Sequence, residues 1–360
     1  MKNNIFEELF VLELANNHWG GLQRGLEIID AFAKIVRFNN IRAAIKLQIR
    51  DVENFIHKDF RNRKDIRYIA KTMATQMSLD DYAALVKAIR NASCITMATP
   101  FDEKSVDICD KLGIEIFKIA SSDINDWVLI ERIVRTRKPV IVSTGGSSLK
   151  DIDDLVTFFD RREIPLAINH CVSIYPSEKN DLEMNQIDFL KNRYPGHTVG
   201  FSTHETNDDI EIAMIIAVAK GVKIFERHID IITADKEISP YCSSPKDLDR
   251  WIKAYKKALL FCGHSGLEKA RPKNKEITYL DALVRGVYAR KELKKGHKIT
   301  DDDVYLAIPL QKRQISCREL MRGETLLNDI KKDDPLTIND IDSAYADNDE
   351  LKKLICERGL

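Results

Sequence analysis

The sequence predicts an α/β fold, a (β/α)₈ TIM barrel followed by a small second domain. Eight short apolar runs recur between residues 11 and 229 of the 360-residue chain, and segments with helical periodicity separate most of them. Strands that alternate with helices indicate a parallel sheet, and eight such units over about 250 residues match the size of a closed barrel. A doubly wound sheet is the competing arrangement, but no G-x-G-x-x-G motif follows the first run.

The elements follow one another in a regular order. The predicted strands are residues 11–15, 43–49, 95–100, 116–121, 140–145, 166–171, 198–204 and 223–229. The predicted helices carry apolar residues at helical spacing and cover residues 23–36, 79–89, 103–112, 149–159, 208–219 and 246–261.

The character of the chain changes after the barrel, which we assign to residues 1–265. Residues 266–282 are polar, basic and turn-rich, and are predicted to be a linker. Residues 283–342 contain short strand-like pieces and two similar phrases, each with a basic turn, a threonine and acidic residues. A domain of about 60 residues is marginal alone, so we expect it to dock on another surface. Residues 343–360 are charged and predict a peripheral helix.

Composition excludes several classes of function. The 56 basic and 56 acidic side chains give a formal charge of zero, so no global field favours nucleic acid or an anionic membrane. The sequence contains no run of about 18 apolar residues, so it predicts no membrane span. The first residues lack a signal-peptide pattern, and the seven cysteines are scattered without a C-x-x-C motif. These features favour a cytoplasmic protein with reduced thiols.

Two strand ends predict a metal site. His204 lies two residues after Ser202, and His228 lies two residues after Glu226. Residues i and i+2 of a strand share a face, so each histidine points to the same side as its polar neighbour. If the two strands are adjacent, the imidazoles form a pair suited to Mn²⁺, Fe²⁺, Co²⁺ or Zn²⁺. Two histidines leave coordination positions for water and substrate.

Polar residues at the other strand ends predict an anionic substrate. Lys46 and Lys118 lie inside apolar runs, where burial of an ammonium group is unfavourable without a partner. Lysines, serines and threonines bind phosphate and carboxylate oxygens by charge-assisted hydrogen bonds. The remaining candidates at these ends are Glu13, Asn17, Gln48, Thr99, Ser121, Asp123, Ser143, Ser173, Tyr175 and Ser202.

In this order, these residues resemble the sialic acid synthase family, which includes N-acetylneuraminate, legionaminate and pseudaminate synthases. Residues 283–342 resemble the antifreeze-like (SAF, β-clip) domain of that family. The motifs are Glu13-x-x-x-Asn17-His18-x-Gly20, Lys46-x-Gln48, Thr99-Pro100-Phe101, Lys118-Ile-Ala-Ser121, Val142-Ser143-Thr144-Gly145, His170-Cys171-x-Ser173-x-Tyr175-Pro176, Gly200-x-Ser202-x-His204 and Glu226-Arg227-His228.

The resemblance implies a reaction and a role for each residue. Phosphoenolpyruvate condenses with an open-chain N-acetylated hexosamine-type sugar to give a nine-carbon 2-keto sugar acid and phosphate. Glu13 and Asp123 match carboxylates near the reacting centre, and Asn17, Ser173 and Tyr175 match the sugar side. His204 and His228 match the ligands of a divalent metal, Mn²⁺ first, with Mg²⁺ or Co²⁺ as alternatives. The positions that match phosphoenolpyruvate contacts are Lys46, Gln48, Thr99, Lys118, Ser121, Ser143 and Ser202.

The departures from the family pattern fall on the sugar side. Ile308 stands where the family's small domain has an arginine that reaches the sugar of the partner subunit, and Arg313 or Lys312 is the candidate replacement. Residues 237–240 replace a Gly-Pro-Asp stretch after the eighth strand. We infer that the donor half of the site is kept and the acceptor half has diverged.

The resemblance also implies partners and a setting. We expect a homodimer in which the small domain of one chain completes the active site of the other, in cytoplasmic carbohydrate synthesis for the cell envelope. Two alternatives stay open. One is a non-catalytic or regulatory homologue that binds phosphoenolpyruvate or sugar without turnover. The other is a different phosphoenolpyruvate or aldol-type carbon–carbon lyase on the same barrel.

Overall fold

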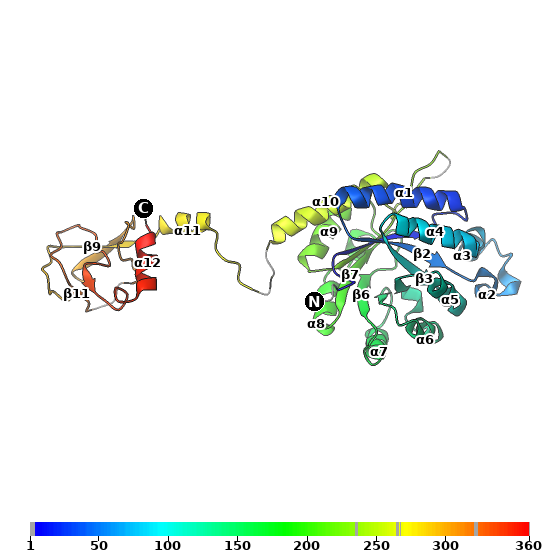
Figure 1. Cartoon of the computed structure of the whole chain (residues 1–360), viewed down its shortest axis with the longest axis horizontal. Coiled ribbons are helices and arrows are strands. Elements are labelled where there is room, and N and C mark those ends of the chain that lie inside the picture. Colours follow the sequence, from blue (N-terminus) through cyan, green and yellow to red (C-terminus); the bar gives the residue numbers. More distant parts are fainter. Residues whose placement is uncertain (1–3, 235–236, 264–265, 267, 320–322, 360) are drawn as a thin grey trace. The chain divides into compact units, whose positions relative to one another are not determined.

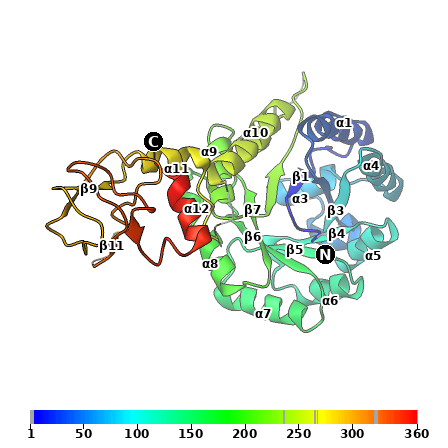
Figure 2. The same cartoon turned by 60° about the vertical axis from the view of Figure 1, so that its left-hand side comes forward.

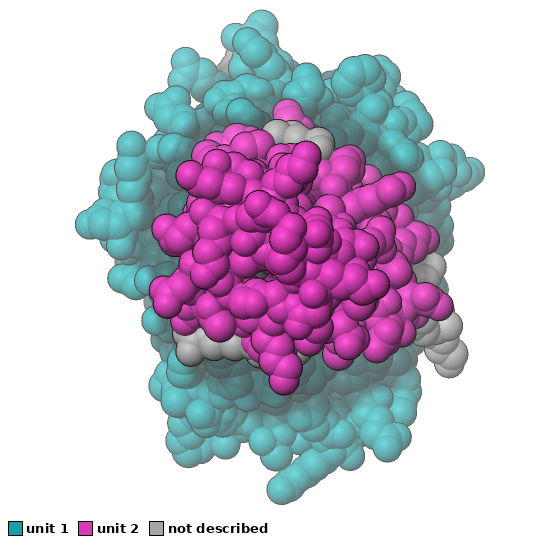
Figure 3. All heavy atoms as spheres, turned by 90° about the vertical axis from the view of Figure 1, so that its left-hand side faces the viewer, with its two compact units in different colours: residues 1–263 teal, residues 264–360 magenta. Residues whose placement is uncertain are grey.

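Eight parallel strands close into a barrel surrounded by helices (Figure 1). The computed structural model describes residues 4–234, 237–263, 266, 268–319 and 323–359. The chain divides into two compact units, residues 1–263 and 264–360, which Figure 3 distinguishes by colour. The closed barrel in the first unit confirms the predicted TIM-barrel class and excludes the doubly wound sheet.

The strands coincide closely with the apolar runs of the sequence. Strand β8 pairs with both β7 and β1, which closes the barrel. The strands are β1 Leu9–Ala15, β2 Ala43–Ile49, β3 Ile95–Pro100, β4 Ile116–Ile119, β5 Val140–Ser143, β6 Leu166–Cys171, β7 Thr198–Thr203 and β8 Ile224–His228.

The helices that follow these strands form the outer layer of the barrel (Figure 2). Three of them begin with a serine in a capping box, Ser78, Ser148 and Ser244. The sequence analysis missed α6, α8 and the helices between β2 and α4. The helices are α1 Leu22–Asn39, α2 Val52–Phe55, α3 Arg67–Ala74, α4 Leu79–Asn91, α5 Glu103–Lys111, α6 Trp127–Arg135, α7 Leu149–Asp160, α8 Gln186–Arg193, α9 Ile210–Ala219 and α10 Pro245–Cys262.

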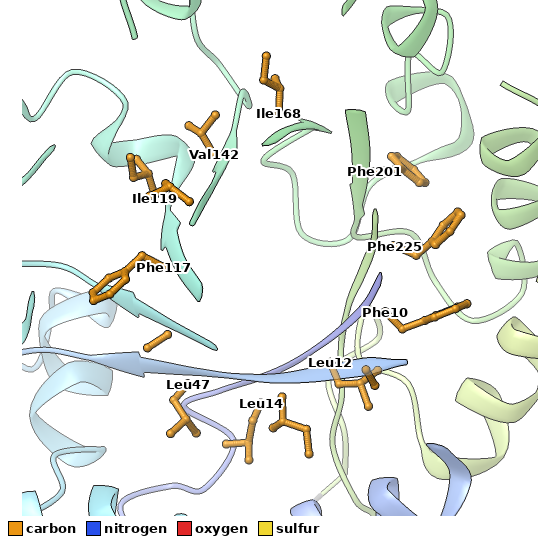
Figure 4. Packing of buried hydrophobic residues seen from close by; sticks show 14 of the residues in the cluster. Phe10, Leu12, Leu14, Leu47, Phe117, Ile119, Val142, Ile168, Phe201 and Phe225 are labelled. Atoms are coloured by element: carbon orange, nitrogen blue, oxygen red, sulfur yellow. The ribbon is translucent and has the colours of Figure 1, made fainter. Parts of the chain in front are cut away.

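Alternation along the strands produces two apolar layers. Phe10, Leu12 and Leu14 of β1 point outward and pack with the helices (Figure 4). The other set fills the interior of the barrel and consists of Leu9, Val11, Ala44, Met97, Ile116, Ile141, Ala167 and Ile224. Two residues further along each strand, the inward positions become polar, and they include Glu13, Lys46, Lys118 and Glu226. The barrel floor is therefore apolar and its carboxyl end carries the polar groups.

The second unit has a small core of its own, built around Val287, Leu336 and Ile338. Residues 266–282, predicted to be a linker, contain the helix α11, none of whose residues is buried. The two similar phrases fold as the same turn, because Thr300 and Thr337 each donate their backbone N–H to the carboxylate three residues later, at 2.8 and 2.9 Å. The elements of this unit are α11 Asn274–Asp281, β9 Gly286–Ala289, β10 Val304–Ala307, β11 Thr325–Leu326, β12 Ile341–Asp342 and α12 Asp349–Glu357.

In the described part of the chain, no helix combines the length and the apolar composition needed to cross a bilayer.

Candidate active site

A cavity of about 560 Å³ opens at the carboxyl ends of the barrel strands. All of the predicted site residues except Asp123 and Arg313 line it. The cavity also receives residues that the sequence analysis did not assign to the site, namely Ala15, Asn16, Arg50, Tyr68, Lys71, Thr72, Phe101, Ala120, Ser122, Gly145, Cys171, Glu226 and Tyr241.

Two buried lysines share one buried carboxylate at the base of this cavity. The Lys46 ammonium lies 2.5 Å from Glu226 Oε1, and the Lys118 ammonium lies 3.0 Å from each Glu226 oxygen. Lys46 also contacts the Glu13 carboxylate. Strand order explains the cluster, because β1 lies between β8 and β2 and places Glu13 opposite Lys46. Two cations and two anions meet where an anionic substrate could enter.

The electrostatics of the cluster favour ionised groups. Burial alone would raise the pKa of Glu226, but the charges of Lys118 and Lys46 outweigh burial and hold this pKa well below its usual range. Burial lowers the pKa of Lys46 to about 7, although Glu226 opposes the shift. Because the charged form of Lys46 is the one that binds both carboxylates, we assign it the ammonium form.

Asn169 and Gly200 complete the base of the cavity. The Asn169 amide donates to Glu226 Oε2 at 3.1 Å. A Cβ atom at position 200 would lie 2.0 Å from Asn169 Oδ1, so glycine is the residue that leaves room for this amide. Gly145 has the same role nearer the mouth, since a Cβ there would lie 2.2 Å from Ser173 Oγ. Neither Asn169 nor Glu226 was assigned to the site from the sequence. The sequence analysis noted Glu226 because it lies two residues before His228, but no residue of its own strand indicated that Lys46 and Lys118 would be its partners.

Hydroxyl groups around the lysines are available for an anion. Ser143 Oγ is buried and has no hydrogen-bond partner among the described residues. Ser121 Oγ accepts the backbone N–H of Gly145 at 3.0 Å. Ser143, Ser202 and Thr99 are buried at the ends of three different strands. Together with the ammonium groups, these hydroxyls can satisfy phosphate or carboxylate oxygens.

The two histidines predicted to bind metal are neighbours, as the strand pairing required. Their ring centroids are 5.4 Å apart, and the Tyr175 ring lies 4.0 Å from that of His204. Burial lowers the pKa of His204 to about 4 and that of His228 well below its usual value, so both rings are neutral near pH 7. His204 Nδ1 lies 2.9 Å from the carbonyl oxygen of Val172, so Nδ1 carries the proton and Nε2 the lone pair. This chemistry fits a divalent cation. No third histidine, cysteine or carboxylate joins the pair within the described residues, so water or substrate would complete the coordination.

Of the remaining predicted site residues, Asn17 lines the cavity, whereas Asp123 and Arg313 are not among its lining residues. The Asn17 amide donates to the carbonyl oxygen of Ile229 at 2.8 Å, which fixes it against the end of β8. Asp123 is half-buried in a turn after β4 and does not line the cavity. Its Oδ2 has no partner among the described residues, and burial raises the pKa of its carboxyl. Arg313 belongs to the second unit, at a φ of +64°, and its role at the site stays a prediction.

A second, larger cavity of about 910 Å³ lies outside the barrel mouth, beside α2, α5 and α6. It is lined mainly by charged side chains, and two of them, Asp107 and Arg132, form an ion pair on the protein surface. It contains neither the buried lysines nor the histidines. The cavity at the strand ends is therefore the candidate active site.

Fold and site together define a (β/α)₈-barrel enzyme class, with polar groups of many strands gathered at the carboxyl end of the barrel. Residues 38–265 match the model of the NeuB family, and residues 284–342 match that of the SAF domain. The chain belongs to the NeuB family, whose relatives include sialic, legionaminic and pseudaminic acid synthases. This confirms the predicted resemblance and makes the protein a member of a family of sugar acid synthases.

Several proteins illustrate this kinship. A crystal structure of a putative spore coat polysaccharide biosynthesis protein E from Chromobacterium violaceum is 34% identical, with a TM-score of 0.90, and the match covers 93% of this chain and 100% of that one. The N-acetylneuraminic acid synthetase of Leptospira borgpetersenii is 28% identical, with a TM-score of 0.66, over 76% and 91% of the two chains. The N,N'-diacetyllegionaminic acid synthase of Campylobacter jejuni is 23% identical over 90% of this chain and 92% of its own.

Proposed function

We propose that the protein condenses phosphoenolpyruvate with the open-chain aldehyde of an N-acetylated hexosamine-type sugar. The products are a nine-carbon 2-keto sugar acid, of the sialic, legionaminic or pseudaminic acid type, and phosphate. The observation that carries this proposal is the buried pair Lys46 and Lys118 around Glu226, in the cavity that also holds the histidine pair. A small, highly charged anion is the substrate that such a base suits best.

In this proposal the base of the cavity binds the donor. Lys46 and Lys118 neutralise the phosphate and carboxylate of phosphoenolpyruvate, and Glu226 keeps both ammonium groups charged and oriented. Ser143 supplies a hydroxyl that has no partner among the described residues. The other proposed donor contacts are Gln48, Thr99, Ser121 and Ser202.

The reaction balances without an oxidant or reductant. C3 of the enol forms a bond to the aldehyde carbon, and the oxygen of one water molecule forms a bond to C2. The C2–O bond to phosphate then breaks, with its electron pair leaving on the phosphate. One proton of the water passes to the former aldehyde oxygen and the other to phosphate. Glu13, in contact with Lys46 and 3.4 Å from the Gln48 amide, is our candidate for handling these protons.

The acceptor end of the cavity contains the histidines. His204 and His228 are the residues that would hold a divalent metal, Mn²⁺ first and Mg²⁺ or Co²⁺ as alternatives. Such an ion supplies Lewis-acid polarisation of the aldehyde oxygen. Asn17, Ser173 and Tyr175 line the same cavity and are our candidates for sugar contacts, with Arg313 as a further candidate from the second unit. Asp123 remains our second candidate for acid–base work, because it follows Ser121 and Ser122, which line the cavity, and burial raises the pKa of its carboxyl.

We also propose that the protein acts as a homodimer. Apart from Glu211, all residues of helix α9 are apolar, and the helix exposes Ile212, Ile215 and Ile216. At the end of α10, which packs against α9, Leu260 and Phe261 are more than four-fifths exposed. Exposed apolar surface of this kind supports an interface with a second copy.

The proposed function is tested by phosphate release from phosphoenolpyruvate in the presence of Mn²⁺. The acceptors are a panel of N-acetylated hexoses and their 6-deoxy diamino relatives, and mass spectrometry identifies the nine-carbon product. Release that requires one sugar and is lost in His204→Ala supports the synthase. Tight binding of phosphoenolpyruvate without release supports a binding-only homologue. A product formed without loss of phosphate supports another carbon–carbon lyase.

A further inference from the structure

The two imidazoles of the histidine pair are held in different ways. The ring of His204 is fixed by the contact of its Nδ1 with the carbonyl oxygen of Val172, at 2.9 Å. The ring of His228 forms no hydrogen bond with any described residue. A histidine that binds a metal usually donates its other ring N–H to a carbonyl or carboxylate oxygen, which fixes the plane of the ring. Another contact must therefore orient His228.

Aromatic rings supply that contact. The Tyr241 ring lies 5.3 Å from the His228 ring, at an interplanar angle of 86°. The Tyr175 ring lies 6.0 Å from His228, at 85°. Both tyrosines therefore meet the imidazole edge to face, which is a favoured arrangement of aromatic pairs. Rotation of the imidazole about its Cβ–Cγ bond would break both perpendicular contacts.

The two tyrosines contact different histidines most closely. Tyr175 has its nearest ring contact with His204, at 4.0 Å. Tyr241 is the nearer of the two tyrosines to His228, and it also contacts Tyr175 at 5.3 Å. Tyr241 is half-buried in the wall of the cavity. It is the side chain best placed to fix the plane of His228.

The backbone on either side of this contact is anchored. Ser243, two residues after Tyr241, donates its backbone N–H to the carbonyl oxygen of His228 at 2.9 Å. The Ser243 hydroxyl donates to Asn207 Oδ1 at 2.8 Å. The Asn207 amide in turn donates to the carbonyl oxygen of Cys242 at 2.8 Å. The segment that carries Tyr241 is thus bound to the end of β8, so the tyrosine and the histidine keep a fixed relation.

We propose that Tyr241 is a positioning residue for divalent-metal binding. Its ring holds the imidazole of His228 in the orientation in which this residue and His204 together bind the cation. The inference rests on the proposed function, because it concerns the histidine pair proposed to hold the metal. Without the tyrosine ring, His228 gains rotational freedom that it must lose again when the metal binds.

The test measures the affinity of the substrate-free protein for Mn²⁺, from the electron paramagnetic resonance signal of the unbound ion. Tyr241→Leu should weaken Mn²⁺ binding by roughly tenfold or more, as expected when a residue that orients a metal ligand is removed. Tyr241→Phe keeps the ring, so its affinity should stay within about threefold of wild type. The matched control is Tyr279→Leu, which changes an exposed tyrosine of α11 that does not line the cavity, and it should bind Mn²⁺ as wild type does.

Two further measurements distinguish positioning from a general structural role. Calorimetry should give Tyr241→Leu an affinity for phosphoenolpyruvate within about twofold of wild type, since the charge-assisted contacts of the two lysines are unchanged. The loss of phosphate release in Tyr241→Leu should be largest at low Mn²⁺ and should be recovered at saturating Mn²⁺. A variant with a generally disturbed cavity would show neither the retained affinity nor the recovery.

Three outcomes overturn the inference: unchanged Mn²⁺ affinity in Tyr241→Leu, an equal loss in Tyr241→Phe, or an equal loss of Mn²⁺ and phosphoenolpyruvate affinity in Tyr241→Leu. None of them bears on the synthase, which is decided by phosphate release in the wild type. Mn²⁺ binding that depends on the Tyr241 ring, without phosphate release from any acceptor, supports the inference and rejects the synthase. If the wild type binds no Mn²⁺, Mg²⁺ or Co²⁺, the inference is rejected, and phosphate release without added metal decides the synthase separately.

Discussion

Arg227 and Glu205 form a fully buried ion pair, with Nη1 and Oε1 3.1 Å apart. Glu205 directly follows His204 in the sequence, and Arg227 directly precedes His228. Arg227 also donates to Ser243 Oγ at 2.5 Å, and the backbone N–H of Ser243 donates to the carbonyl oxygen of His228 at 2.9 Å. The pair therefore connects the ends of β7 and β8 and fixes the two imidazoles relative to each other. It positions the histidines without touching the cavity.

Arg227→Met should lower the free energy of unfolding by about 3–5 kcal/mol, because it leaves the Glu205 carboxylate buried without a cation. Denaturation in urea, followed by circular dichroism, measures the change. The control is Arg250→Met, which removes an exposed pair with Glu211 and should change the free energy of unfolding by less than about 1 kcal/mol. Equal losses in the two variants would show that the buried pair contributes no more to the free energy of unfolding than the exposed pair does.

Stability should also depend on pH through His18. Burial lowers the pKa of this histidine to about 4, with Asp81 opposing the shift, whereas in the unfolded chain it is about 6.5. As the pH falls from 6.5 towards 4, the unfolded state binds a proton that the native state does not, so stability falls by about 1.4 kcal/mol per pH unit. Above pH 6.5 both states are neutral and the contribution is constant.

The measurement compares wild type with His18→Gln at pH 7.5 and pH 5. Wild type should lose about 2 kcal/mol more free energy of unfolding than the variant over this range. His57→Gln, which removes an exposed histidine, serves as the matched control and should follow wild type. If His18→Gln and wild type lose the same amount, His18 does not carry this dependence.

Lys46→Ala should weaken phosphoenolpyruvate binding by roughly tenfold to a hundredfold, because it removes a charge-assisted contact at the base of the cavity. Titration calorimetry on folded protein measures the dissociation constant. Because the change also takes a cation from Glu13 and Glu226, the double variant Lys46→Ala, Glu226→Gln separates lost binding from lost charge balance. Lys87→Ala, on the outer helix α4, is the control. Unchanged affinity in Lys46→Ala would refute the donor assignment.

Gly200→Ala should destabilise the protein by about 1–3 kcal/mol through overpacking. The new methyl group would lie 2.0 Å from Asn169 Oδ1 and 2.8 Å from Ile224 Cβ, so the Asn169 amide must move away from Glu226. We therefore also expect a higher KM for phosphoenolpyruvate. Gly196→Ala is the matched control, since a Cβ there has no atom within 4 Å. A Gly200→Ala protein as stable and active as Gly196→Ala would contradict the packing argument.

The proposed homodimer predicts a particle of twice the chain mass in light scattering. The double change Ile212→Glu and Ile216→Glu should give a monomer, because two charges would be buried at the interface. Val128→Glu, at a similarly exposed apolar residue on α6, should stay dimeric. A monomeric wild type would reject the dimer. Full activity in a chain ending at residue 275 would reject a role for the second domain in completing the site.

The sequence predicted those features of the fold that follow from a pattern among neighbouring residues. Apolar runs of β1 to β8, with their polar ends, identified the barrel strands within a few residues. The i, i+2 spacing placed His204 beside Ser202 and His228 beside Glu226 on shared faces. Short helices with weaker patterns, such as α8, were missed. Helix α11 was assigned to a linker because its segment is polar, basic and turn-rich, and in the structure none of its residues is buried.

Local pattern could not reveal which side chains from distant strands meet. Glu226 and Lys46 are 180 residues apart, and closure of the barrel between β8 and β1 brings them together. The sequence analysis did not single out Arg50, and only the fold places Phe101 beneath its guanidinium and the cavity beside it. The sequence by itself determined the strands, the facing of their polar ends and the residue types of the site, because these follow from the two-residue period of a strand. The tertiary structure alone decided which charges are compensated, because compensation depends on distances between strands that the local period does not encode.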